Sequence, residues 1–538
     1  MSYKLNKIAA ITAFLLTLLF ALFLLQFALY AGALWRDEAN TIAIASLPTL
    51  ADLYKHLQFD SFPILWLLIL RPLVTLGLAT DEGLRTIGFL VGYTLIATLW
   101  LNTRLFRYRW PMISLTLLGL CPSVLIWGSS MRAYGFGMIA IMLMFPLIWN
   151  YVEKGTLKAW GAALFATLIG VHTIYYNSIV VFACIVGGSI VLLKQRDWTR
   201  AAFLSLIGFI AALTLLPYIP AFIGANDWNI VLRSPNYLPA EFWRKINETL
   251  APAGTAVVWV WITLVIFAIL SGIRLQFSTN TDFTDTERNQ VLYALGTLLC
   301  MIPSHYFFLH WLSYPTQPWY YLALLAVLAI SMDTIYGVLS KQSLFQSLRI
   351  GVALLLVCFT TKTVFYQVKV RMTNVDLLAD TIQHSATNQD LIVINSWFYG
   401  MTFERYYHGT VQWDTIPPLP FHQFHRYDLI KKLMQSKNQK GIVVPILQNI
   451  ESILKNGGKV YFVGPLYLMD GIELPDMLPA PNSRRGWSDA PYYTVWSNRV
   501  SIFILHHAKN AQYLDTPTTQ RINDYEHLPM IILDGWKD

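Results

Sequence analysis

Charged residues are scarce in this sequence of 538 residues. They make up 13% of it, whereas soluble domains carry about 25%, and the deficit is concentrated in the first two thirds of the chain. Apolar runs of about 20 residues recur there, which is the length that crosses a hydrocarbon core ~30 Å thick as a helix. A soluble protein is therefore excluded for this region, and the sequence predicts an α-helical multi-pass membrane protein.

Several motifs are also absent. The polar tail 368–538 contains no cysteine, so no disulfide indicates its redox compartment. The tail has no Gly-rich phosphate loop and the chain has no His-Glu-x-x-His motif, so we expect neither a nucleotide site nor a zinc-protease site. All four cysteines lie in apolar runs, at Cys121, Cys184, Cys300 and Cys358.

The net charge of +8 is compatible with nucleic-acid binding, but the distribution of the charges along the chain argues against it. Lys and Arg occur in short clusters between apolar runs, as expected from the enrichment of basic residues in cytoplasmic loops. No basic stripe with exposed aromatic residues is present. We therefore expect no nucleic-acid partner.

Eleven apolar runs are predicted to span the membrane. The first is longer than the ~7–15-residue apolar core of a signal peptide and is expected to be retained. Another segment, 62–78, is interrupted by an Arg-Pro pair and is predicted to lie in the interface. The predicted spans are 8–34, 85–103, 111–130, 133–150, 158–175, 177–194, 201–223, 253–272, 291–310, 317–338 and 349–367.

The basic clusters set the predicted orientation. If 62–78 does not span, Lys4, Lys7 and the basic connections between later spans share one face, which is the cytoplasm. We therefore expect a cytoplasmic N-terminus in the plasma (inner) membrane. The first loop 35–84, the loop 224–252 and the tail 368–538 are then extracytoplasmic. The chain divides into a membrane domain, 1–367, and a separate tail domain.

The tail alternates short apolar runs with amphipathic stretches. This pattern predicts a small extracytoplasmic α/β domain with a mostly parallel sheet. Its role is open, and a lid or an acceptor-docking domain is the simplest interpretation. Strands are predicted at 391–395, 441–445 and 459–463, and helices at 375–385, 426–436 and 447–456.

The first loop opens with Arg36, Asp37 and Glu38 directly after an apolar helix. A carboxylate this close to lipid is costly unless it is paired or functional. Alone, the cluster could be a polar stop signal in which Arg36 pairs with Asp37. However, residues 49–57 predict a capped amphipathic helix, followed by Asp60, a proline and a second interfacial helix. Together these segments are typical of a roof over a cavity at the membrane surface.

The stretch Trp35-Arg-Asp-Glu-Ala39, followed by Phe59-Asp-Ser-Phe-Pro-Ile-Leu-Trp66, resembles the membrane glycosyltransferases of the GT-C fold. These include protein O-mannosyltransferases and lipid A aminoarabinose transferases. Members have an Asp-Glu pair after the first span and a later acidic residue near Pro-Pro-Leu. This chain departs from the pattern with Phe62-Pro63 in place of Pro-Pro. It also has Ser61 where some members have a phosphate-binding Lys, which argues against phosphate binding there.

The resemblance implies a glycosyltransferase that uses a polyprenyl-phosphate-linked sugar. The acceptor would be a hydroxyl of a lipid, glycan or protein on the extracytoplasmic face. Asp37 matches the general base of the family, with Glu38 as a partner that could simply hold Arg36. Arg36 would either keep Asp37 ionised or bind the donor phosphate. We expect no cofactor and no metal, although the acidic pair could hold the divalent ion that some relatives use.

Further candidates lie at predicted external helix ends. Arg132, two residues before Tyr134, would bind the leaving phosphate, or would only snorkel to the interface. The other substrate-binding candidates are Tyr134, Asp60, His172 and His310. For His172, a structural role is the alternative. His305 and His310 frame a predicted external helix end beside aromatic residues that could form only an interfacial belt: Trp311, Tyr314 and Trp319. Three loop cations could close over the phosphate or stay solvated: Arg233, Arg244 and Lys245.

Two other functions compete with transfer. A transporter or flippase for a lipid-linked sugar would need ionisable groups in mid-bilayer or discontinuous helices. A non-catalytic scaffold would not need the acidic pair. The sugar and the acceptor do not follow from the sequence, because a fold hosts many functions.

Overall fold

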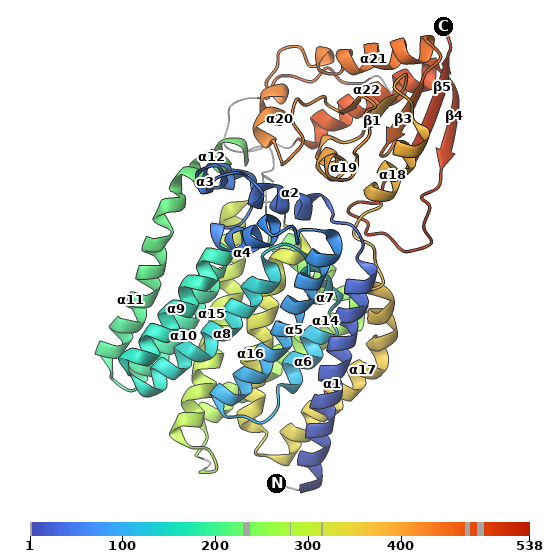
Figure 1. Ribbon diagram of the computed structural model, residues 1–538. Coiled ribbons are helices and arrows are strands. Elements are labelled where there is room, and N and C mark those ends of the chain that lie inside the picture. Colours follow the sequence, from blue (N-terminus) through green and yellow to red (C-terminus); the bar gives the residue numbers. More distant parts are fainter. Residues whose placement is uncertain (1–2, 230–236, 280, 314–315, 468–473, 481–488) are drawn as a thin grey trace. The chain divides into compact units, whose positions relative to one another are not determined.

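The computed structural model describes residues 3–229, 237–279, 281–313, 316–467, 474–480 and 489–538 (Figure 1). The chain forms two compact units. The helical unit comprises Met1–Tyr30, Ser61–Ile219 and Asn236–Lys369, and the sheet unit comprises Ala31–Asp60, Pro220–Pro235 and Val370–Asp538. The first half of the first loop thus belongs to the same unit as the C-terminal tail.

Nine helices in the described part of the chain are long and apolar enough to cross a membrane. The protein is therefore a multi-pass membrane protein. These helices are α1 (Tyr3–Tyr30), α5 (Asp81–Phe106), α8 (Tyr134–Lys154), α10 (Asn177–Lys194), α11 (Trp198–Thr214, which continues towards α12, Ile219–Asn229), α14 (Thr255–Phe277), α15 (Asp285–Leu312), α16 (Leu322–Leu339) and α17 (Ser343–Gln367).

The other two predicted spans are also helical but do not reach this length. α9 (Leu157–Thr173) has 17 residues. The predicted span 111–130 is not continuous, because it forms α6 (Met112–Gly119) and α7 (Pro122–Trp127). Pro122 lacks an N–H and therefore cannot continue α6, but it fits the first turn of a new helix.

The segment 62–78 forms the short helix α4 (Ile64–Thr75). Its 12 residues rise only ~18 Å at 1.5 Å per residue, which is less than the ~30 Å of the hydrocarbon core. α4 is therefore not a span, in agreement with the prediction from charge.

α16 is the buried centre of the helical unit, since all of its residues are buried. It packs against α6, α8 and α15 (Figure 1). Near the end of α16, the fully buried Asp333 accepts the N–H groups of Ile113 (3.1 Å) and Ser114 (3.0 Å). These are N–H groups of the first turn of α6, which have no partner within the helix. Arg349 pairs with the same carboxylate at 3.4 Å.

The sheet unit contains five strands in the order β2-β1-β3-β5-β4. β1 pairs in parallel with β2 and β3, whereas β5 pairs antiparallel with β3 and β4. The expectation of a mostly parallel sheet is therefore wrong for one half of it. The strands are β1 (Leu391–Ile394), β2 (Trp413–Thr415), β3 (Lys459–Val463), β4 (Ala508–Leu514) and β5 (Met530–Trp536).

The run 441–445 is not a strand, in contrast to the prediction. It forms a helical turn and the start of α21 (Val444–Lys455), with Pro445 in the first turn. Ile446, Ile450 and Leu454 then recur at intervals of four residues and are buried. Their periodicity places the segment in a helix that covers the sheet.

Successive side chains of a strand point to opposite faces of the sheet. Apolar side chains of β1 therefore lie on both faces, and helices cover each of them. On one face, Leu391 and Val393 share a hydrophobic cluster with α20 (Tyr427–Met434), α21 and α22 (Ala490–His507). On the other, Ile392 and Ile394 share a cluster with α18 (Val375–Ser385) and α19 (Gly400–Tyr406). The sheet unit also contains α2 (Arg36–Ala45) and α3 (Leu50–His56), and the helical unit contains α13 (Pro239–Leu250).

Candidate active site

The acidic pair of the first loop occupies the first turn of α2. Glu38 is fully buried, and its Oε2 accepts the backbone N–H of Trp35 at 3.3 Å. A carboxylate at this position satisfies an otherwise unpaired N–H and interacts favourably with the helix dipole. The geometry of Glu38 is therefore that of a helix cap, which favours a supporting role over proton transfer.

Asp37 has the geometry of an accessible carboxylate. Its side chain is 20% exposed. Its Oδ1 lies 3.3 Å from Nε2 of His425 and 3.5 Å from Nε of Arg36. Asp37 is thus held between an imidazole and a guanidinium while part of it remains open, as a group that exchanges protons with a substrate requires.

Arg36 is fixed by aromatic rings and carboxylates. Its guanidinium carbon lies 4.7 Å from the ring centre of Phe398 and 5.5 Å from that of Trp35, within the range of cation–π attraction. Burial acts to lower the pKa of Arg36, but the charges of Asp37 and Glu526 offset it, and the pKa is raised. Arg36 therefore stays charged and supports the ionised form of Asp37.

Glu526 was not predicted from the sequence. It is fully buried, and its Oε2 accepts the backbone N–H of Arg36 at 2.9 Å. Burial raises the pKa of Glu526 to about 7, although the charge of Arg36 acts against the rise. Glu526 thus anchors the beginning of α2 and titrates near neutral pH.

Asp60 is hydrogen-bonded to α2, the helix that begins with Arg36 and Asp37. Thr41 Oγ1 donates to Asp60 Oδ2 at 3.1 Å, and Asn40 Nδ2 donates to the carbonyl of Phe59 at 3.2 Å. Residues three and four positions apart share one face of a helix. Asp37, Asn40 and Thr41 therefore form a single polar face of α2, to which Phe59 and Asp60 are attached.

Arg132 and Tyr134 lie together in the helical unit. The guanidinium carbon of Arg132 is 4.4 Å from the ring centre of Phe62, and Phe62 meets Tyr134 edge to face at 5.1 Å. Arg132 is only 4% exposed. A snorkelling side chain extends its charge towards water, so this burial favours the binding interpretation of Arg132.

The candidate histidines differ in their surroundings. Nδ1 of His172 lies 2.8 Å from the hydroxyl of Tyr218, and Nδ1 of the exposed His310 lies 2.8 Å from the carbonyl of Tyr237. Both have the hydrogen bonds of structural residues. His305 is 1% exposed, and its ring lies 5.6 Å from that of Tyr321.

The loop cations form ion pairs within one helix. Arg244 pairs with Glu241 at 2.6 Å and Lys245 with Glu248 at 2.8 Å, all on α13. These pairs account for both cations without a phosphate. Arg233 lies outside the described residues.

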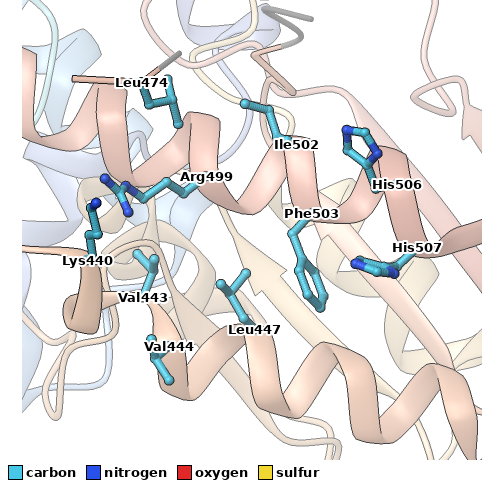
Figure 2. Close-up of a pocket in the computed structure, with 10 residues that line it drawn as sticks. All are labelled: Lys440, Val443, Val444, Leu447, Leu474, Arg499, Ile502, Phe503, His506 and His507. Atoms are coloured by element: carbon cyan, nitrogen blue, oxygen red, sulfur yellow. The ribbon is translucent and has the colours of Figure 1, made fainter. Parts of the chain in front are cut away.

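Among the residues that the structure describes, no three His, Cys, Asp or Glu side chains gather as a metal site would require. A separate pocket of about 410 Å³ lies between α21 and α22. Figure 2 shows Lys440 and Arg499 directed towards each other at one end, and Phe503 and His507 at the other. In the part of the chain that the structure describes, the residues that line this pocket include no carboxylate. Lys440 and Arg499 are paired with Asp476 instead, at 2.6 and 3.7 Å.

No family model matches the chain, and no curated protein matches its sequence. Among solved structures, the chain is similar to the crystal structure of ArnT from Cupriavidus metallidurans bound to undecaprenyl phosphate. The TM-score is 0.47 and the identity 11%, over 83% of this chain and 92% of that chain.

Proposed function

We propose that this protein is a membrane glycosyltransferase that moves a sugar from a polyprenyl-phosphate donor to an acceptor hydroxyl on the extracytoplasmic face. The observation that carries the proposal is Asp37, a partly exposed carboxylate in the first turn of α2, 3.3 Å from His425 and 3.5 Å from Arg36. It agrees with the resemblance of the first loop to GT-C transferases.

In the proposed reaction, Asp37 takes the proton of the acceptor hydroxyl as the oxygen attacks the anomeric carbon of the sugar. A bond forms between this oxygen and the carbon, and the bond from the carbon to the phosphate oxygen breaks. The polyprenyl phosphate leaves with one additional negative charge, which balances the proton gained by Asp37. A general base is needed because a neutral hydroxyl is a weak nucleophile.

The leaving phosphate needs a cation, and Arg132 is our candidate. Its planar guanidinium can donate two parallel hydrogen bonds to phosphate oxygens. Its burial against Phe62 limits its movement, so less side-chain entropy would be lost on binding. Tyr134, which meets the Phe62 ring edge to face, helps to hold this arrangement.

The helical unit contains two features of the kind that the alternative function, a transporter, would require. The first is the interruption between α6 and α7, and the second is the buried pair of Asp333 and Arg349. However, Asp333 is six residues from the end of α16, and Arg349 is six residues from the beginning of α17. The pair therefore lies near the connection between these helices, where it caps α6, and does not form a charge in the middle of the membrane.

A direct experiment separates transfer from transport. The wild-type protein is reconstituted in proteoliposomes with synthetic undecaprenyl-phosphate-linked hexoses or aminopentoses, and with envelope glycolipids as acceptors. Mass spectrometry then measures the release of undecaprenyl phosphate, while the sidedness of the intact sugar lipid is followed in parallel. We expect release with at least one donor. Movement of intact sugar lipid without release would instead identify a flippase.

A further inference from the structure

The ring of His425 is held in one orientation. Its Nε2 lies 3.3 Å from Asp37 Oδ1, and its backbone N–H donates to Asn40 Oδ1 at 2.9 Å. The ring stacks on Tyr427 at 5.3 Å with an angle of 20°, and meets Trp397 edge to face at 6.1 Å. His425 is 7% exposed. These contacts fix both its backbone and its imidazole.

One face of α2 makes both polar contacts. Asp37 and Asn40 are three residues apart and therefore lie on the same side of the helix. Asp37 contacts the imidazole of His425, while Asn40 accepts its backbone N–H. Asn40 also donates to Phe59. The segment between β2 and α20 is thereby attached to α2 at two points, with its histidine beside the carboxylate.

From this geometry we infer that His425 is a positioning residue for Asp37. It donates from Nε2 to Asp37 Oδ1 and fixes the rotation of the carboxylate that accepts the proton of the acceptor hydroxyl. Nε2 must be the protonated nitrogen, because a carboxylate that is ionised only accepts hydrogen bonds. The inference rests on the proposed function of Asp37. It implies that the C-terminal tail, which contains His425, contributes a residue to the catalytic site.

The bond has a chemical consequence besides orientation. A hydrogen bond to the ionised form of a carboxyl group favours that form. Without His425, the pKa of Asp37 is expected to be higher, so less of the base is ionised at a given acidic pH. The other charged or titratable groups nearby are Arg36 on α2, Glu526, which accepts the backbone N–H of Arg36, and three residues that directly follow His425: Arg426, Tyr427 and Asp428.

The test uses the full-length protein in proteoliposomes and measures release of undecaprenyl phosphate from the donor that the wild type uses. The variants are His425→Ala, which removes the donor, and His425→Gln, whose amide nitrogen can replace Nε2. His422→Ala is the matched control. His422 lies three residues away and packs against Trp413 at 4.4 Å, so its loss also disturbs this segment without removing the contact with Asp37.

We expect His425→Ala to lower kcat about ten- to a hundredfold, the usual effect of losing a hydrogen bond to a charged group. The KM for the donor should not change. The acidic limb of the pH profile should move to higher pH, because the hydrogen bond that favours the ionised carboxylate is lost. His425→Gln should recover most of kcat, and His422→Ala should leave the acidic limb in place.

Three outcomes would overturn the inference. The first is wild-type kcat and an unmoved acidic limb in His425→Ala. The second is an equal loss in His425→Ala and His425→Gln. The third is a further loss of kcat, of the same size, when His425→Ala is added to Asp37→Asn. A residue that acts only by positioning the Asp37 carboxylate should have no effect in a protein that lacks this carboxylate. His425→Met, which fills the space without a donor, replaces the alanine variant if that variant does not fold.

Failure of the inference differs from failure of the proposed function. An inactive Asp37→Asn together with a fully active His425→Ala would contradict only the role of His425. A fully active Asp37→Asn would contradict the role of Asp37 as the base, and the inference with it.

Discussion

Replacement of Glu526 by Gln should change the pH dependence of stability. Burial raises the pKa of Glu526 from an ordinary value of 4.5 to about 7. An acid with a raised pKa in the folded protein contributes stability that is complete below its unfolded pKa. This stability is lost as the pH rises through the folded pKa. The wild type should therefore become less stable between pH 4.5 and about 7.

The size of this effect follows from the shift. A rise from 4.5 to about 7 corresponds to ~3 kcal/mol at 1.36 kcal/mol per pKa unit. Gln has almost the same shape, stays neutral, and retains an oxygen that can accept the N–H of Arg36. Glu526→Gln should therefore equal the wild type at pH 4 and exceed its free energy of unfolding by ~3 kcal/mol at pH 8.

Urea or thermal unfolding of the detergent-solubilised protein, followed at several pH values, measures this difference. Glu451→Gln is the matched control, because Glu451 is a partly exposed residue of α21 that pairs with Lys455 at 2.5 Å. This control should follow the wild-type profile. A Glu526→Gln profile parallel to that of the wild type would refute the reasoning, as would a variant that is less stable at pH 8.

Three further predictions concern other parts of the chain. Asp333→Ala leaves the buried Arg349 without its carboxylate and the first N–H groups of α6 without their acceptor. Thermal unfolding should therefore report a free energy of unfolding about 3–5 kcal/mol lower. Arg132→Ala should weaken donor binding about ten- to a hundredfold with an unchanged acceptor KM, and an unchanged donor KM would reduce Arg132 to a structural residue. Finally, a cysteine introduced at Asn510 on β4 should react with an impermeant reagent applied to intact cells, whereas its protection would contradict the proposed orientation.

The helices of the membrane region could be predicted because length and hydropathy alone determine them. The interruption of 111–130 was missed, since its composition is as apolar as that of a continuous span. Pro122 was the available signal, because proline commonly begins a helix. Pro445 is the same signal: the β-branched run before it is typical of a strand, but the residues after it have the periodicity of a helix.

The candidate site could be predicted only in part. Arg36, Asp37, Glu38 and Asp60 were found because they follow the first span within one short loop. His425 lies 388 residues beyond Asp37, and Glu526 lies 490 residues beyond Arg36. No periodicity or spacing connects such positions, since only the folding of the tail around α2 brings them together.

The measurement that tests the central claim most directly is donor cleavage by Asp37→Asn. Asn has nearly the same size as Asp and keeps an oxygen that can accept a hydrogen bond, but it cannot take a proton. Release of undecaprenyl phosphate should fall by at least ~10²-fold, while folding and donor binding remain at the wild-type level. Release near the wild-type rate would contradict the account and would place the base elsewhere, with Asp60 as the next candidate.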